Sequence, residues 1–357
     1  MKRVRWIDQL RAFAIISIVL GHALGQLNLG SSLFNHALYL YHVPLCLTIS
    51  GYLFSVRRGL DNGISFVKKI FMKQMVPYYI WGIISIGIYC LMFGRHDIMS
   101  EGGRYLLGLL YANGSLGRGA DSSGLMVWNT PMWYLPCAFT IEVMVTLLVN
   151  IFSISNVQKA AGAMVVAIAT GLVLYEFLDV HTLFMEIESA IYLIPFFFLG
   201  MLLNRASNRK KEKKNELLTS IGLILFGEVM GFINGSPGYL SDGYGKNYVL
   251  FVVSAGMICS GMFRLFELLD MSGKVGLILQ YVGNRTLEIL VMHKFPIMAF
   301  VLILKLLPSK VPFGLLTALV ITVGSIVLCL ACGEIINNLC PFMIGKKKKH
   351  KLQPSEN

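Results

Sequence analysis

The sequence predicts an all-α membrane protein, a single bundle of about ten transmembrane helices with both termini in the cytoplasm. Composition is the first indication, because the 357 residues are 55% hydrophobic and only 14% charged, with a mean hydropathy of +0.67. The apolar residues also gather into segments of the length that spans a bilayer, roughly 20 residues in a helix. Finally, Lys and Arg concentrate on one side of these segments as the chain crosses back and forth, as the positive-inside rule requires.

Ten apolar segments follow one another with mostly short connections. We expect helices near residues 7–29, 38–56, 74–93, 131–152, 157–176, 187–204, 216–234, 247–266, 286–307 and 312–336. With the N-terminus inside, the basic residues expected outside are only Arg95, Arg104, Arg118, Lys246, Lys305 and Lys310. We expect residues 1–345 to form one polytopic domain and residues 346–357 to form a basic, polar cytoplasmic tail.

The formal net charge of +12 does not predict a nucleic-acid partner, because the basic residues follow the topology. We expect them to contact anionic lipid instead. The seven cysteines are an odd number and lie mostly in apolar segments, which argues against a disulfide framework. Cys329 and Cys332 form a lone CxxC in a hydrophobic segment, which we interpret as packing. We expect no metal.

Two longer outer loops carry aromatic and polar residues. Residues 94–130 contain an amphipathic piece from Arg104 to Tyr111 and a Gly/Ser-rich stretch, and residues 234–247 are rich in Gly and Tyr. Loops of this length in a compact bundle are usually lids, binding surfaces or links. The aromatic residues at this boundary are Trp128, Trp133, Tyr134, Tyr239 and Tyr244. They either form an interfacial aromatic belt or include side chains that stack on sugar rings.

The first apolar segment carries three ionisable side chains, Asp8, Arg11 and His22. Such groups are expensive in hydrocarbon, so they usually face a cavity or pair with one another. Arg11 and His22 are eleven residues apart, which places them on one helix face about 16 Å apart. Arg11 could also be a snorkelling anchor paired with Asp8, and His22 could be a core histidine bonded to a carbonyl.

Further ionisable residues interrupt the later segments: His42, Glu142, Glu228, His293 and Lys294. Glu142 reaches the middle of the membrane, where a carboxyl group must be either protonated or paired with a cation or an imidazole. Glu228 is interpreted as structural. Histidines and carboxylates in hydrocarbon indicate proton handling, by a transporter or by an enzyme.

At these residues the chain resembles the acyltransferase-3 family of membrane acyltransferases. The resemblance is carried by Arg5-x-x-Asp8-x-Leu10-Arg11 with His22, by His42 to Leu53, by Lys69, Lys73, Pro77 and Tyr78, by Trp133 to Pro136 with Glu142, by Phe196 to Gly200, and by Gly283 to Pro296. These motifs run in order through nearly the whole chain. The sequence departs from the family where lysines replace the usual arginines before Pro77 and where Cys46 replaces an aromatic residue.

The resemblance implies an O-acetyltransferase of surface polysaccharides in the bacterial inner membrane. Such an enzyme moves an acyl group from cytoplasmic acetyl-CoA, or another acyl-CoA, to a hydroxyl of an extracytoplasmic or lipid-linked glycan. It implies catalytic roles for His22 as general base, Glu142 and Arg11. Arg11, Lys69 and Lys73 would hold the CoA phosphates, and His42, Trp133 and His293 would bind the acceptor. The sequence sets no oligomeric state.

Two alternatives use the same fold without acyl transfer. One is a proton-coupled transporter, which inverted repeats or helices unwound within the membrane would favour. The other is a partner protein in polysaccharide export, which would tolerate loss of His22 but not of the loops.

Overall fold

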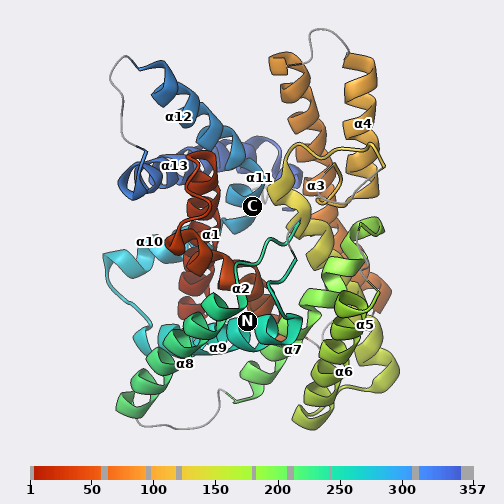
Figure 1. Ribbon diagram of the computed structural model, residues 1–357, viewed down its shortest axis with the longest axis vertical. Coiled ribbons are helices and arrows are strands. Elements are labelled where there is room, and N and C mark those ends of the chain that lie inside the picture. The colour runs from red at the N-terminus through yellow and green to blue at the C-terminus, as the bar shows by residue number, and fades with distance from the viewer. Residues whose placement is uncertain are drawn as a thin grey trace, which may run out of the picture.

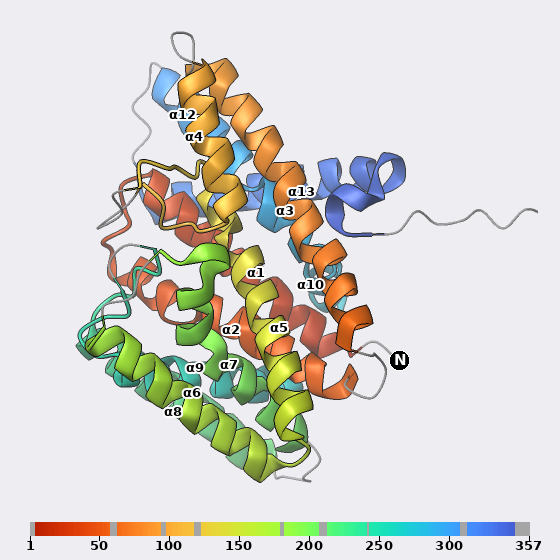
Figure 2. The same ribbon diagram turned by 90° about the vertical axis from the view of Figure 1, so that its right-hand side faces the viewer.

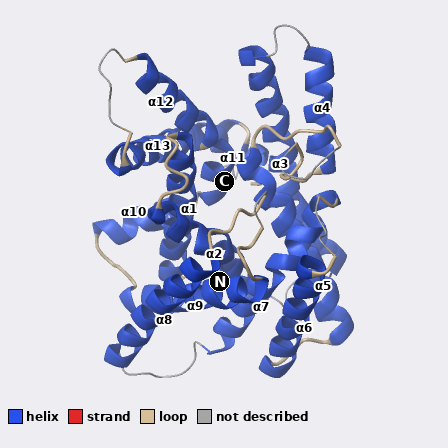
Figure 3. Cartoon of the chain, in the orientation of Figure 1, coloured by secondary structure: helices blue, strands red, loops and turns tan. Residues whose placement is uncertain are grey.

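The computed structural model describes residues 4–57, 63–93, 98–117, 123–178, 182–206, 213–240, 243–307 and 313–346. Over these residues the chain consists of helices and connecting loops (Figure 3), with one isolated antiparallel bridge between Gly238 and Gly243. The predicted all-α class is confirmed.

The helices follow the predicted order, with two shorter helices added and one predicted helix divided in two. They are α1 (Arg5–Gln26), α2 (Leu33–Arg57), α3 (Gly63–Phe93), α4 (Ile98–Tyr111), α5 (Tyr134–Phe152), α6 (Val157–Glu176), α7 (Ile187–Ala206), α8 (Lys213–Asn234), α9 (Tyr248–Leu269), α10 (Lys274–Gly283), α11 (Thr286–Met292), α12 (Lys294–Leu306) and α13 (Leu315–Leu339), with short 3₁₀ turns η1 (Thr130–Trp133), η2 (Phe184–Glu186) and η3 (Pro341–Ile344). Among the described residues, nine helices are long and apolar enough to cross a membrane, or ten if α11 and α12 form one span. The side of the membrane on which each terminus lies stays a prediction.

Helix α1 lies at the centre of the bundle. In its most apolar stretch 78% of the residues are buried, against 17% in α6 and α8. It packs against α2, α9, α10, α11, α12 and α13. Figure 1 shows α1 between α10, α12 and α13 on one side and α3 and α5 on the other, while α4 lies alongside α3 at the end of the molecule away from α6 and α8 (Figure 2). The helix that carries Asp8, Arg11 and His22 is therefore shielded from lipid by protein.

The structure corrects two predicted elements and adds a third. Helix α3 begins at Gly63 rather than near 74, so its basic residues lie within the helix. The predicted helix 286–307 is broken into α11 and α12, which meet at His293 with a bend of 50°. Pro296 explains this break, because its ring clashes with the carbonyl of the residue four positions earlier and it has no N–H to donate. Helix α10 is only 10 residues long and was not predicted, because it is too short to span.

Helices α2 and α7 approach each other through glycine. A Cβ on Gly51 of α2 would lie 1.9 Å from the carbonyl oxygen of Phe197, and one on Gly200 of α7 would lie 2.0 Å from that of Thr48. Small residues allow this close backbone contact, which is a main source of stability between helices in lipid, where burial of apolar surface gives no advantage. The α2–α7 pair forms one wall of the bundle and fixes the position of α2 against α1.

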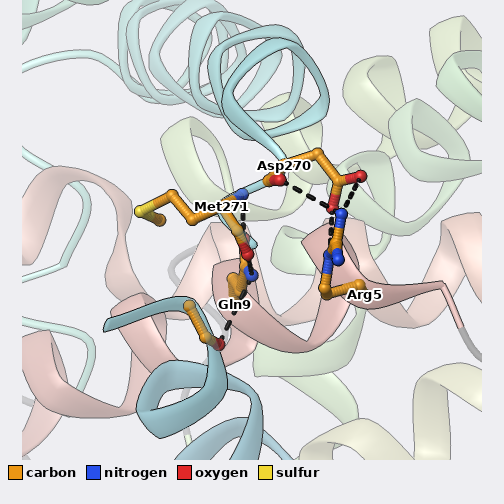
Figure 4. A network of polar contacts seen from close by, with 5 residues as sticks. Arg5, Gln9, Asp270 and Met271 are labelled. Atoms are coloured by element: carbon orange, nitrogen blue, oxygen red, sulfur yellow. Dashed lines mark hydrogen bonds and ion pairs between the residues drawn. The ribbon is translucent and has the colours of Figure 1, made fainter. Parts of the chain in front are cut away.

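A polar clamp joins the start of α1 to the connection between α9 and α10 (Figure 4). Arg5 donates from Nε and Nη2 to the two carboxylate oxygens of Asp270, at 2.8 Å each. Gln9 donates to the carbonyl oxygen of Met271 at 2.6 Å and accepts from its N–H at 3.2 Å. A bidentate arginine–carboxylate pair is geometrically specific, so the clamp sets the orientation of α1 at this end.

We expect Gly51→Ala to destabilise the protein strongly, because the added methyl group overlaps a backbone oxygen that only a shift of α7 could move. Gly162→Ala in α6 is the matched control, since nothing lies within 4 Å of the added Cβ. It should be neutral or stabilising, because Ala is the better helix former by about 1 kcal/mol. Thermal unfolding of both purified variants in the same detergent measures the difference, and equal midpoints would contradict the close packing.

The clamp should also contribute stability that depends on pH. The Arg5 guanidinium beside Asp270 holds the pKa of that carboxyl below its usual value of 3.8. A carboxyl pKa that is lower in the folded state than in the unfolded state stabilises the folded protein at pH values above the unfolded pKa. This contribution is lost as the pH falls through the folded-state pKa. Asp270→Asn should therefore lower the unfolding midpoint slightly at pH 7 and by less at pH 3. A difference that persists unchanged at pH 3 would show that the charge of Asp270 is not what stabilises the contact.

Candidate functional site

One face of α1 lines two cavities. The first, called the Arg11 cavity, has a volume of about 400 Å³. From α1 it is lined by Arg11, Ile15 and Ile18, and the rest of its wall comes from α2, α3, α5, the end of α10, α11, and the end of η3 with the two residues after it. The spacing of its α1 residues, four and then three, is that of a single helix face. The predicted cation therefore faces a cavity and not lipid.

The second cavity lies farther along the same face and is called the His22 cavity. Its volume is about 300 Å³, and its α1 lining is Ile18, His22, Gly25 and Gln26. The remaining lining includes His42 and Tyr39 of α2, Trp133 of η1 and Tyr239 of the loop before α9. The structure thus places His22, His42 and Trp133 in the lining of one cavity.

The two cavities share one wall. Ile18, Tyr134 and Leu290 line both of them and come from α1, α5 and α11 respectively. Ile18 lies seven residues after Arg11 and four before His22, or about 10 Å and 6 Å along the helix. The spaces beside Arg11 and beside His22 are therefore separated by the thickness of single side chains.

Three of the charged groups that the sequence singled out line the Arg11 cavity: Arg11, Lys73 and Glu142. Arg11 donates to Asp8 at 3.2 Å, and Asp8 is only 2% exposed. Gln74 donates to Glu142 at 2.9 Å, and both line this cavity with the exposed Lys73. Glu142 thus lies with Arg11, in the cavity that His22 does not line.

Lys69 and Lys73 have different positions. They are one helical turn apart on α3, and both are exposed, but only Lys73 lines the Arg11 cavity. Lys346 lines it too, although it was assigned to the tail. It donates to Glu288 at 2.6 Å, and Glu288 is 1% exposed. No motif indicates this lysine, because its position depends on the turn at η3 that returns the chain to α3, where a Cβ on Gly345 would lie 2.6 Å from the carbonyl oxygen of Lys73.

The His22 cavity is lined by stacked aromatic rings. Trp133 and Tyr239 stack with ring centroids 5.9 Å apart, and Tyr239 also meets the edge of His42 at 5.7 Å. The Tyr239 hydroxyl donates to the carbonyl oxygen of Tyr39 at 2.6 Å. Trp133 and Tyr239 are 7% and 9% exposed, so they do not face lipid as an aromatic belt would. The loop from 234 to 247, where it is described, thus supplies part of the cavity.

Two buried carboxyl groups that the sequence did not single out support the aromatic rings that line the His22 cavity. Glu186 in η2 is completely buried and accepts from the backbone N–H of Gly114 and the hydroxyl of Ser189. Glu188 accepts from the side chain of Asn113. A Cβ on Gly114 would lie 2.5 Å from Cβ of Trp133. These hydrogen bonds therefore hold the segment after α4 directly against Trp133.

His22 faces a second imidazole. The rings of His22 and His293 have centroids 5.2 Å apart, and His293 is completely buried at the break between α11 and α12. Nδ1 of His293 lies 3.0 Å from the carbonyl oxygen of Ile289 and 2.9 Å from that of Leu290. Carbonyl oxygens only accept, so Nδ1 carries the proton, and in a neutral ring Nε2 is the acceptor. This Nε2 is buried and has no hydrogen-bond partner.

Lys294 turns away from this pair. Its Nζ lies 4.4 Å from the centre of the Trp128 ring and donates to the carbonyl oxygen of the same residue. This cation–π contact at the break anchors the start of α12. Among the described residues, no group of three or more His, Cys, Asp and Glu side chains could hold a metal ion.

The comparison with known protein families gives one match over most of the chain. A family model described as an acyltransferase domain, of the acyltransferase-3 type, matches residues 4–334. That range contains every residue that lines the two cavities except Ile344, Gly345 and Lys346. No curated protein matches the chain.

Proposed function

Since the chain belongs to the acyltransferase-3 family of membrane acyltransferases, we propose that it moves an acyl group from cytoplasmic acyl-CoA to a hydroxyl of an extracytoplasmic or lipid-linked glycan. Acetyl is the proposed group, and the bacterial inner membrane is the proposed location. One observation carries this proposal: Arg11 and His22 lie on the same face of α1 in two cavities that share a single wall. A donor bound beside Arg11 can therefore present its acyl group next to an imidazole that an acceptor reaches from the other side.

The Arg11 cavity suits the donor. Its volume of about 400 Å³ fits a pantetheine arm, and the larger nucleotide would stay at the mouth. Lys73 and Lys346 are exposed there, and Arg11 lies deeper. Arg offers a planar fork for phosphate, whereas Lys acts as a point charge. We propose that Lys346 takes the part expected of Lys69, with Glu288 holding it at the rim.

The His22 cavity suits the acceptor. Flat aromatic rings such as Trp133 and Tyr239 stack on sugar rings, and His42 adds a polar group. In the proposed reaction the acceptor hydroxyl oxygen forms a bond to the thioester carbonyl carbon, and the carbon–sulfur bond breaks. His22 takes the hydroxyl proton and passes it to the departing CoA thiolate. General-base catalysis of this kind contributes typically a factor of 100 to 10,000.

His293 is proposed to orient that base. Its acceptor Nε2 can receive a hydrogen bond from a protonated ring nitrogen of His22, which leaves the other nitrogen of His22 unprotonated toward the acceptor. A base held in one tautomer by a buried neighbour is a common arrangement in acyl transfer. Glu142 would then act on the donor side, with Arg11 and Lys73, rather than on His22.

A proton-coupled transporter is the second candidate, and the break between α11 and α12 favours it. Helices interrupted at membrane depth form the binding sites of many transporters, and this one carries His293 and Lys294 at its bend of 50°. Solute uptake into proteoliposomes that lack acyl-CoA would decide for transport, and acyl transfer without uptake would decide against it.

His22→Ala should abolish acyl transfer while leaving acetyl-CoA binding intact, because it removes the base from the cavity that the donor does not occupy. Arg11→Ala should weaken acetyl-CoA binding itself. Mass spectrometry of the surface polysaccharide from cells with each variant measures transfer, and equilibrium binding of labelled acetyl-CoA to the purified protein measures the donor step. His36→Ala is the matched control, since His36 is half-buried on α2 and lines neither cavity.

Full modification of the polysaccharide by His22→Ala would remove His22 as the base. Loss of modification in His36→Ala to the same degree would show that the effect is structural. If the wild-type protein fails to bind acetyl-CoA, the donor assignment is wrong and the transporter becomes the better candidate.

His293→Ala should lower the transfer rate about tenfold or more without changing acetyl-CoA affinity, because His22 then loses the neighbour that orients it. His293→Gln keeps an acceptor oxygen near the position of Nε2 and should recover much of the rate. The pH–rate profile of each variant distinguishes this role from packing, since only an orienting partner alters the protonation of the base. Equal rates and equal pH profiles for the Ala and Gln variants would contradict it.

A further inference from the structure

The wall between the two cavities has a composition that bears on which acyl groups can react. It consists of two aliphatic side chains, Ile18 and Leu290, and the ring of Tyr134. Ile18 and Leu290 are each 6% exposed, so both are packed in place. Tyr134 is the first residue of α5 and directly follows Trp133, which lines the His22 cavity.

Tyr134 has different neighbours in the two cavities. In the Arg11 cavity it lies with Ser50 and Cys46 of α2, which do not line the His22 cavity. Ser50 Oγ donates to the carbonyl oxygen of Cys46 at 3.1 Å. In the His22 cavity it lies with His22 and His42, which do not line the Arg11 cavity. Tyr134 therefore stands between the residues that are particular to each cavity.

We propose that Ile18, Tyr134 and Leu290 form the seat of the acyl group and limit its length. This inference rests on the proposed function. A thioester that enters from the Arg11 cavity must place its carbonyl carbon at this wall to be within reach of His22. The methyl group of an acetyl fits between the three side chains, whereas each further methylene must displace one of them.

The close packing of this wall sets how strongly it discriminates between acyl groups of different length. A well-packed pocket that must accept one methylene too many discriminates by roughly 10- to 200-fold. Packed side chains do not yield continuously, because interiors are close-packed. The wall should therefore reject a hexanoyl group at least tenfold, and shortening a wall residue should relax this limit without affecting the sites for the CoA phosphates.

The chain offers a matched pair of isoleucines for the test. Ile15 and Ile18 lie one turn apart on the same face of α1 and are 3% and 6% exposed, but Ile15 lines the Arg11 cavity alone. Competition of CoA, acetyl-CoA, butyryl-CoA and hexanoyl-CoA against labelled acetyl-CoA is measured on the purified full-length protein. The ratio of the affinity for each acyl-CoA to the affinity for CoA gives the contribution of the acyl group to binding, because the nucleotide is common to both.

In the wild type we expect hexanoyl-CoA to bind at least tenfold more weakly than acetyl-CoA. Ile18→Ala and Tyr134→Leu should reduce this ratio about tenfold, and Ile15→Ala should leave it unchanged. If Tyr134→Leu does not fold, the isoleucine pair decides alone. A wild type that binds all chain lengths equally, or equal shifts in Ile15→Ala and Ile18→Ala, would overturn the inference. A wild type that binds no acyl-CoA would instead refute the donor assignment of the proposed function.

Discussion

The desolvation of ionisable groups on α1 is the constraint on which the rest of the structure depends. Asp8, Arg11 and His22 lie in a segment of spanning length, and exposing them to acyl chains would cost several kcal/mol. The fold avoids this by surrounding α1 with helices, by pairing Arg11 with Asp8, and by lining two cavities with the polar face. Helix α2, which packs closely against α7 through glycine, supplies Ser50 to the first cavity and His42 to the second.

The break at His293 follows a similar logic at a different place. Pro296 interrupts the helical hydrogen bonds, and unsatisfied backbone groups are tolerated at membrane depth only where protein surrounds them. The carbonyl oxygen that Pro296 leaves without a helical donor is that of Met292. The imidazole of His293 contacts two other carbonyl oxygens in the last turn of α11, and one of them, that of Ile289, also accepts from the backbone N–H of His293. These contacts set the tautomer of a ring that faces His22. The break in the helix thus places an oriented imidazole beside His22.

The sequence was sufficient for the spanning segments and for placing Arg11 and His22 on one helix face, but not for the division of the candidate site residues between two cavities. Apolar length and charge placement predict each span because they depend only on local composition, and helical spacing correctly put Arg11 and His22 on one face. The grouping of Glu142 with Arg11 and of His42 with His22 depends on how α5 and α2 pack, which no local pattern encodes. Lys346 was missed for the same reason: its neighbour Glu288 is distant in sequence, and the turn that joins them follows the last span.

Two adjoining cavities separated by single side chains also meet two opposing requirements of a reaction between a donor and an acceptor on opposite sides of a membrane. A donor and an acceptor on opposite sides must come within bonding distance, yet an open polar passage would let water and ions through. In the proposed arrangement, the wall of Ile18, Leu290 and Tyr134 would oppose the passage of hydrated solutes, because they would have to shed their water there. A small acyl group carries no charge and loses little on entering such a wall. In the proposed reaction, the surface that separates the two cavities would thus also be the surface that accepts the transferred group.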